Sequence, residues 1–158
     1  MKHVFVSIIN FNGANNTLEC LLSLDKMNLK SFKISVVVID NASDTEFRIE
    51  NLEFRMLKVK VIRNEENLGF SGGQNVGIKY ALDNGADYIL ILNNDTIVDK
   101  HLIEELLNAA EKDKDIGIAA PKIYFASGFE FHKDRYKKSD LGKVFWYAGG
   151  EMLSLIHI

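Results

Sequence analysis

The sequence predicts an α/β fold in which helices flank a mostly parallel sheet. Four short apolar runs, at residues 4–9, 34–39, 59–62 and 88–92, alternate with segments of helical period. This alternation is typical of βαβ units. At 158 residues and 47% hydrophobic composition, the chain is long enough for one domain with its own core and short for two. We therefore expect a single domain over residues 1–158.

Capping patterns predict where the helices between the strands begin. Asn16, Ser43 and Ser71 each stand three residues before a Glu or Gln, which is the arrangement of a capping box. A fourth helix is expected from about Asp99, because apolar residues then recur with helical spacing. These residues are Leu102, Ile103, Leu106, Leu107 and Ala110.

The last third of the chain predicts short antiparallel strands beside the parallel core. After Pro121, the only proline, the apolar runs shorten to residues 123–125 and 144–147 and become rich in aromatic residues. The charged loop 132–138 between them is interpreted as a solvated face, with contact to an anionic ligand as the alternative. The apolar residues 153–158 either pack or mark a cut in the chain, and they offer a surface for a homo-oligomer.

Composition argues against several classes of function. The chain has 19 Lys and Arg against 22 Asp and Glu, a net charge of −3, so we expect no nucleic-acid partner. No run approaches the roughly 20 apolar residues that cross a bilayer, so any membrane contact would be peripheral. The single cysteine, Cys20, cannot form an internal disulfide and favours a packing role in a reducing compartment. We expect a cytoplasmic protein, with membrane contact confined to the inner face.

Asp95 is the strongest candidate for a binding residue. The apolar run 88–92 stops at Asn93, Asn94 and Asp95. Open α/β sheets bind ligands in the crevice at the carboxyl ends of their strands. A carboxylate flanked by amide oxygens suits a hard divalent cation, which keeps several waters and takes further ligands from substrate phosphates. The sequence therefore predicts a metal-diphosphate site after the fourth strand.

Polar side chains also follow the first two predicted strands. Asn10 and Asn12 follow the first strand, and Asp40 and Asn41 follow the second. A carboxylate in such a place can accept hydrogen bonds from a base N–H or a ribose hydroxyl. Turn formation or helix capping is the competing interpretation for these side chains. Because the ends of parallel strands share one edge, we expect these side chains to converge.

A glycine-rich segment joins the third strand to the next helix. Residues 67–77 contain four glycines, which let backbone amides approach an anion such as phosphate at a helix N-terminus. The segment does not fit a P-loop, because Ile78 rather than Lys follows Gly77, and it does not fit Gly-x-Gly-x-x-Gly. A tight strand-to-helix connection is the competing interpretation for any single glycine.

The strand-end motifs together resemble the family 2 glycosyltransferases of GT-A fold, a Rossmann-like architecture. The motifs are Val-Ser-Ile-Ile-Asn-Phe-Asn at 6–12, Val-Ile-Asp-Asn-Ala-Ser-Asp at 38–44, Asn-Leu-Gly-Phe at 67–70 and Asn-Asn-Asp at 93–95. The resemblance spans roughly residues 3 to 150 and implies a nucleotide-sugar-binding domain that uses Mg²⁺ or Mn²⁺. It places Asp95 and Asn93 at the metal. The nucleotide-binding candidates are Asn10, Asn12, Asp40, Asn41, Asn67, Gly69, Asn75, Asn93 and Asn94.

Two departures from the family pattern matter. Asn93 stands where the family's Asp-x-Asp signature has its first Asp, and the loss of one charge should weaken cation binding. With Tyr-Ala-Gly-Gly at 147–150, this form is more similar to the rhamnosyltransferase-like branch, which favours a deoxyhexose donor linked to dTDP, UDP or GDP. The family's general base lies well beyond the metal motif, and no matching acidic motif occurs here. We therefore expect the base beyond residue 158 and the chain to be an N-terminal part, truncated before the acceptor-binding half.

The resemblance implies an inverting glycosyltransferase of polysaccharide biosynthesis at the cell envelope. Such an enzyme transfers a sugar from a nucleotide-diphosphate sugar to a hydroxyl of a glycan or lipid-linked acceptor, with a carboxylate as general base. One alternative is a non-catalytic nucleotide-sugar-binding module or truncated pseudoenzyme. A nucleotidyltransferase is the weaker alternative, because its basic glycine-rich loop after the first strand is not visible.

Overall fold

The computed structural model describes residues 1–28, 31–49 and 53–149. The chain divides into two compact units, Met1–Glu104 and Glu105–Ile158. The first unit contains the parallel sheet and the strand ends singled out by the sequence. The second contains a small antiparallel sheet.

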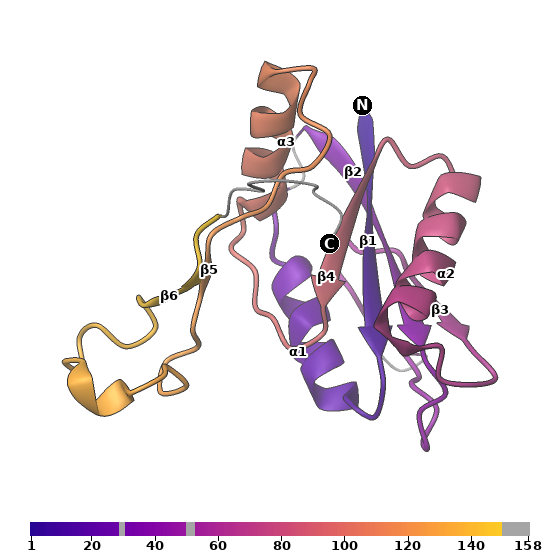
Figure 1. Cartoon of the computed structure of the whole chain (residues 1–158). Helices are drawn as coiled ribbons and strands as arrows, with labels where there is room; N and C mark the ends of the chain where they lie inside the picture. Colours follow the sequence, from indigo (N-terminus) through magenta and orange to yellow (C-terminus); the bar gives the residue numbers. More distant parts are fainter. Residues whose placement is uncertain (29–30, 50–52, 150–158) are drawn as a thin grey trace, which may run out of the picture. The chain divides into compact units, whose positions relative to one another are not determined.

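The first unit is built on a four-stranded parallel sheet in the order β3-β2-β1-β4 (Figure 1). Its strands are β1 (Lys2–Asn10), β2 (Phe32–Asp40), β3 (Val59–Arg63) and β4 (Tyr88–Asn93). The parallel sheet predicted from the four apolar runs is confirmed. From β1 the chain adds β2 and β3 on one side of the sheet and then β4 on the other side. Open α/β sheets form their ligand crevice at such a switch point, here between β1 and β4.

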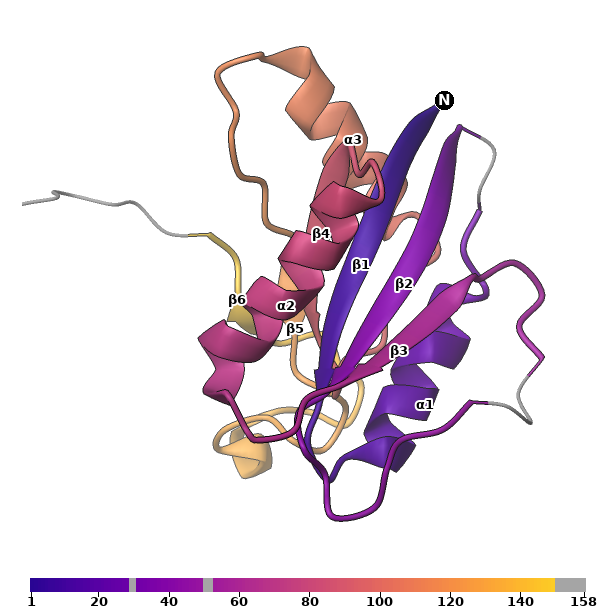
Figure 2. The same ribbon diagram turned by 90° about the vertical axis from the view of Figure 1, so that its right-hand side faces the viewer.

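Helices cover both faces of this sheet, which explains why its central strands are apolar on both faces. The helices α1 (Ala14–Leu24) and α2 (Gly69–Asp83) lie on opposite faces (Figures 1 and 2). The side chains of β1 and β2 that form the core are almost fully buried, as are Cys20 of α1 and Ala81 of α2. The packing role expected for Cys20 is therefore confirmed.

The helix starts predicted from capping boxes are wrong. The first helix begins at Ala14 and the second at Gly69, and neither has a side-chain cap, so Asn16 and Ser71 lie inside helices. No helix follows Ser43 in the described residues 44–49 and 53–58. The Ser43 hydroxyl instead accepts hydrogen bonds from Asn10 Nδ2 and the Asn12 amide, at 3.0 and 2.9 Å. The Ser43 hydroxyl thus bonds to residues far away in the sequence rather than to the start of a helix.

Two glycines let α2 approach the sheet closely. A Cβ at Gly77 would lie 2.1 Å from Ser7 Oγ, and a Cβ at Gly73 would lie 2.9 Å from Ile9 Cδ1. A side chain at either position would force the helix or the facing Ser7 or Ile9 side chain to move. For Gly73 and Gly77, helix packing therefore explains a pattern that the sequence analysis assigned to phosphate binding.

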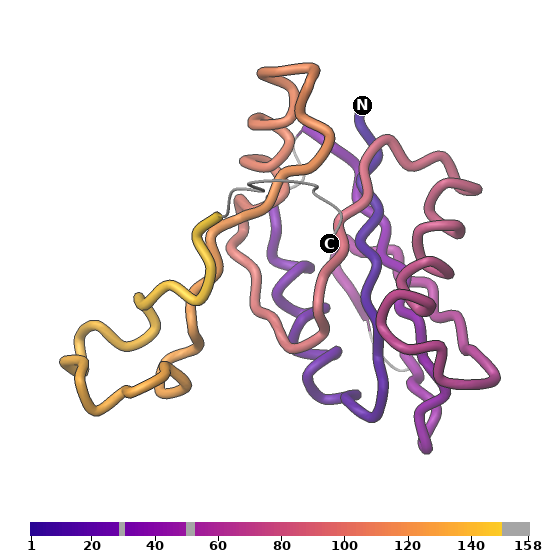
Figure 3. Tube along the Cα trace, viewed as in Figure 1, coloured from indigo at the N-terminus to yellow at the C-terminus, as the bar shows by residue number. Residues whose placement is uncertain are grey.

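The second unit begins within α3 (Leu102–Lys112). This helix starts close to Asp99, where the sequence analysis predicted its start. The strands β5 (Ile123–Tyr124) and β6 (Phe145–Tyr147) pair in antiparallel fashion, as predicted, and a loop with the short 3₁₀ helix η1 (Lys133–Arg135) joins them (Figure 3). The loop is held by Glu130, whose carboxylate accepts N–H bonds from Gly128 and Gly142. The apolar stretch 153–158 lies outside the described residues.

Among the residues that the structure describes, no helix combines the length and the apolar character needed to cross a bilayer.

Candidate functional site

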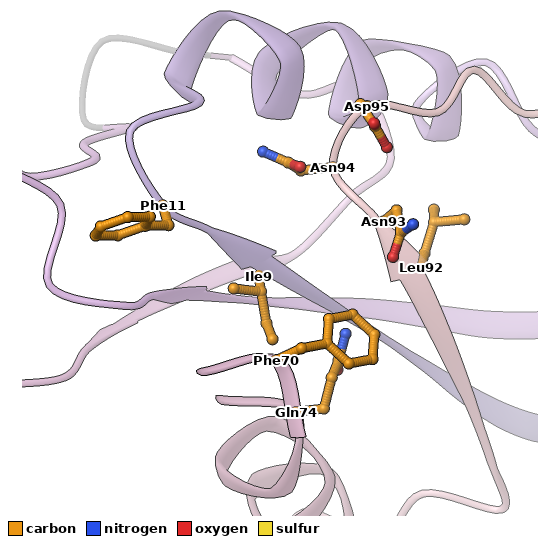
Figure 4. Close-up of a pocket in the computed structure, with 8 residues that line it drawn as sticks. All are labelled: Ile9, Phe11, Phe70, Gln74, Leu92, Asn93, Asn94 and Asp95. Carbon is orange, nitrogen blue, oxygen red and sulfur yellow. The ribbon is translucent and has the colours of Figure 1, made fainter. Parts of the chain in front are cut away.

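A pocket of about 260 Å³ opens at the carboxyl ends of β1 and β4, at the switch point of the sheet. Three consecutive polar residues after β4 form part of its wall, and two residues of α2 form another (Figure 4). The rest of the wall is apolar. The lining residues are Ile9, Phe11, Phe70, Gln74, Leu92, Asn93, Asn94 and Asp95.

The structure brings three of the predicted site residues to this pocket. Asn93, Asn94 and Asp95 follow one another at the end of β4, and Asp95 is exposed. Of the described residues that line the pocket, Asp95 alone is charged. A diphosphate bound here would therefore meet a negative side chain, and a cation between the two would be needed to offset their repulsion.

Asn94 is connected to the end of β1 through a threonine of α1. Its Nδ2 lies 3.0 Å from Thr17 Oγ1, and Thr17 donates to Asn10 Oδ1 at 2.9 Å. Thr17 and Asn10 are buried. The two strand ends on either side of the switch point are thus joined by side-chain hydrogen bonds.

The same line of bonds continues to β2 and β3. Asn10 Nδ2 lies 3.3 Å from Asp40 Oδ1, and Arg63 at the end of β3 forms an ion pair with Asp40 Oδ2. In the sheet register Asn10 stands beside Asp40, and Asp40 beside Arg63. All four strand ends are therefore linked by polar side chains, which is the convergence that the sequence analysis expected.

Asp40 itself is fully enclosed. It has 0% exposure, and its carboxylate also accepts the amides of Ser43 and Phe47, at 3.3 and 3.2 Å. Burial alone would raise the pKa of Asp40, but the hydrogen bonds from Ser43, Phe47 and Asn10 outweigh it and the pKa lies below its ordinary value. In this structure Asp40 organises the end of β2, and its predicted contact with a nucleobase remains a prediction.

The remaining candidates lie around the pocket rather than in its lining. Asn12 and Asp44 exchange two hydrogen bonds. The Asn41 amide binds the connection before α2, with Nδ2 at 2.6 Å from Asn67 Oδ1 and 3.2 Å from the Gly69 carbonyl. Asn75 lies on the exposed surface of α2. Asn12, Asn41, Asn67 and Gly69 thus shape two loops that flank the strand ends.

The sequence of residues 5–152 matches the model of the family described as "Glycosyl transferase family 2". This chain belongs to glycosyl transferase family 2. The resemblance identified from the strand-end motifs is therefore confirmed.

Two relatives of this family 2 protein carry functional names. The "dTDP-rhamnosyl transferase RfbF" of Shigella flexneri is 29% identical over 105 residues, which are 66% of this chain and 33% of the relative. The "Low-salt glycan biosynthesis hexosyltransferase Agl10" of Haloferax volcanii is 32% identical over 97 residues, 58% of this chain and 29% of the relative. The chain thus spans about a third of the length of these relatives.

Solved structures support the fold. TarS of S. aureus, as its fragment 1–349 in complex with UDP-GlcNAc, superposes with a TM-score of 0.57 at 20% identity, over 80% of this chain and 40% of that chain. The same fragment in complex with UDP gives a TM-score of 0.57 at 20% identity, over 80% and 42% of the two chains. The GT-A architecture expected from the sequence is therefore confirmed.

A cation fits the donor atoms that this family 2 domain presents. Within the described ranges, no three His, Cys, Asp or Glu side chains form a complete metal cluster. Mg²⁺ does not need one, because it commonly binds through one or two carboxylates, waters and substrate phosphates. Asp95 supplies a carboxylate at the open pocket, and Asn93 beside it supplies an amide oxygen.

Five lining residues were not identified as site residues from the sequence: Ile9, Phe11, Phe70, Gln74 and Leu92. Gln74 was interpreted as the partner of Ser71 in a capping box and as the neighbour of the candidate Asn75, not as a site residue itself. The signal that could have found it is spacing, because residues four apart on a helix share a face. Phe70 and Gln74 are such a pair at the start of α2.

Proposed function

We propose that this chain is the donor-binding part of an inverting glycosyltransferase that acts on a nucleotide-diphosphate sugar. The observation that carries the proposal is the exposed Asp95, which follows Asn93 and Asn94 at the rim of the switch-point pocket. Membership of glycosyl transferase family 2 and relatives named for dTDP-rhamnosyl and hexosyl transfer support it.

The proposed cofactor is Mg²⁺ or Mn²⁺, held by Asp95 with Asn93 beside it. When bound, such an ion stabilises negative charge on a leaving diphosphate as a Lewis acid. The part of the chain that the structure describes contributes no Lys or Arg to the lining that would do this in its place. Because Asn93 carries no charge, we expect the protein alone to hold the ion weakly and nucleotide to strengthen its binding.

The proposed donor is a dTDP-, UDP- or GDP-linked hexose or deoxyhexose. A deoxyhexose is favoured by the relative named as a dTDP-rhamnosyl transferase, and UDP-GlcNAc is the ligand named for the TarS structure. The proposed acceptor is a hydroxyl of a glycan or lipid-linked saccharide in envelope polysaccharide synthesis. We place the reaction in the cytoplasm or at the inner face of its membrane.

The general base that deprotonates the acceptor is proposed to lie beyond residue 158. Within the described residues the pocket contains one carboxylate, Asp95, and that group is assigned to the cation. An inverting displacement needs a second carboxylate on the acceptor side. We therefore expect the chain to bind its donor but to transfer sugar feebly or not at all.

The test is calorimetry with dTDP-rhamnose, UDP-GlcNAc and GDP-mannose, with and without Mn²⁺. We expect one of them to bind more tightly when Mn²⁺ is present. Asp95→Asn should weaken that Mn²⁺-dependent binding by about tenfold, which corresponds to ~1.4 kcal/mol. Asp83→Asn is the matched control, because Asp83 is a 61% exposed side chain on α2 paired with Lys79. Absence of binding by all three donors would refute the proposal.

A further inference from the structure

One buried polar group of the pocket has no partner. Gln74 is 3% exposed, and its Oε1 accepts a hydrogen bond from Ser7 Oγ at 2.6 Å. Its Nε2 has no hydrogen-bond partner among the described residues. Buried amide groups are nearly always paired, because an unpaired one keeps the full penalty of its desolvation.

The unpaired group does not depend on how the amide is oriented. A serine hydroxyl both donates and accepts, so Ser7 can bond to either end of the Gln74 amide. Exchanging Oε1 and Nε2 would therefore leave the oxygen unpaired in place of the nitrogen. In both orientations Ser7 holds one end of the amide and the other end needs a partner.

The neighbourhood of Gln74 indicates what that partner is. Gln74 lines the strand-end pocket with Phe70, its neighbour one turn earlier on α2, and with the apolar Ile9 and Leu92 (Figure 4). Phe70 is 59% exposed, so its ring can turn without disturbing the core. Only Asp95 in the lining is charged, and it belongs to the rim that follows β4.

We infer that Gln74 recognises the nucleoside of the donor through a hydrogen bond made by its unpaired amide end. A free Nε2 would donate to an uncharged carbonyl, ring nitrogen or hydroxyl, and a free Oε1 would accept from a ring N–H or a hydroxyl. This inference rests on the proposed function and adds a specificity-determining residue to it. The aromatic rings of Phe11 and Phe70 offer faces on which a base can stack.

The diphosphate is a poor candidate for this partner. Among the described residues no Lys or Arg lines the pocket, and Ile9 and Phe70, which line it with Gln74, are apolar. A phosphate placed there would lose its hydration without gaining a counter-charge.

The experiment compares Gln74→Met with wild type in calorimetry with UDP, dTDP and GDP and their monophosphates, each with and without Mn²⁺. We expect Gln74→Met to weaken binding of the preferred diphosphate and its monophosphate alike, by about threefold to tenfold, the range for one neutral hydrogen bond. The loss should be the same with and without Mn²⁺. Lys79→Met, on the exposed surface of α2, is the matched control and should bind as wild type does.

A second variant separates recognition from folding. Ser7→Ala/Gln74→Met removes both buried polar groups together, which leaves no unpaired partner behind. We expect its melting temperature to equal or exceed that of wild type while nucleotide binding stays weakened.

The possible results distinguish failure of this inference from failure of the proposed function. Unchanged nucleotide affinity in Gln74→Met would overturn this inference alone. A loss that appears only with the nucleoside diphosphate, and not with its monophosphate, would also overturn it, because the contact would then lie at the terminal phosphate. If wild type binds no nucleotide at all, both this inference and the proposed function fail.

Discussion

The side chain of Asn94 is tied to α1 by a hydrogen bond from its Nδ2 to Thr17 Oγ1, at 3.0 Å. Thr17 in turn donates a hydrogen bond to Asn10, and Asn10 donates one to Asp40. The rim of the proposed donor site is thereby fastened to the buried strand ends before any ligand binds. A prearranged rim spares the ligand the entropic cost of ordering it.

Replacing the threonine at the centre of this network should destabilise the fold. Thr17→Val keeps the shape of the side chain but removes the hydroxyl that bonds to Asn10 and Asn94. The buried Asn10 Oδ1 then loses this donor, and we expect a loss of about 1–3 kcal/mol in the free energy of unfolding. Urea denaturation measures it. The control is Thr45→Val on an exposed loop; equal stability of the two variants would contradict the prediction.

The stability of the first unit should fall in acid because of Asp40. Its pKa in the folded state lies below the ordinary value of 3.8. A carboxylate with a lowered pKa stabilises the fold fully above its unfolded pKa and loses that contribution as the pH falls through the folded value. The difference in unfolding free energy between wild type and Asp40→Asn should therefore be constant above about pH 5 and shrink below pH 3.8.

Should Asp40→Asn fail to fold, the titration can be followed directly in the wild-type protein. The carboxyl carbon resonance of Asp40 should shift with a midpoint below 3.8. A midpoint above that value would contradict the prediction, since burial would then outweigh the hydrogen bonds from Ser43, Phe47 and Asn10.

Cys20 should be inert towards thiol reagents in the folded protein. Burial raises the pKa of its thiol to about 11, and its side chain is fully enclosed. At pH 8 only about one thiol in a thousand would be ionised, and the thiolate is the reactive form. We expect negligible colour with Ellman's reagent until urea unfolds the protein, and then one equivalent, because the chain has a single cysteine. Rapid labelling of the folded protein would contradict the assignment.

Gly77→Ala should push α2 away from the sheet. The new Cβ would lie 2.1 Å from Ser7 Oγ, so either the helix or the serine must move. Overpacking of this kind typically costs about 1–3 kcal/mol. Gly117→Ala is the matched control, because a Cβ at Gly117 meets nothing within 4 Å. Chemical denaturation of both variants checks the prediction, and equal midpoints would contradict it.

The strands were predictable because their signal is local. Runs such as residues 88–92 are short, apolar on both faces and closed by polar residues, and this pattern is typical of a buried parallel strand. The polar residues at their ends could likewise be placed at one edge. Asn93, Asn94 and Asp95 therefore reach the pocket as the sequence analysis expected.

The helix starts and the chemistry of single side chains were not predictable, because they depend on distant partners. Ser43 resembled a helix cap, but its hydroxyl is taken by Asn10 and Asn12. Gln74 likewise resembled the end of a capping box, whereas its amide reaches Ser7 across the interface between α2 and β1. Residues 31 to 67 positions apart make these contacts, and no local pattern encodes them.

Among the described residues of the first unit, β4 pairs with β1, and Ile91 on this strand is 48% exposed. Exposed β-branched side chains on apolar strands favour association between copies of a protein. Concentrated preparations should consequently associate through this strand, and a lysine introduced by Ile91→Lys would act as a gatekeeper that keeps the protein dispersed.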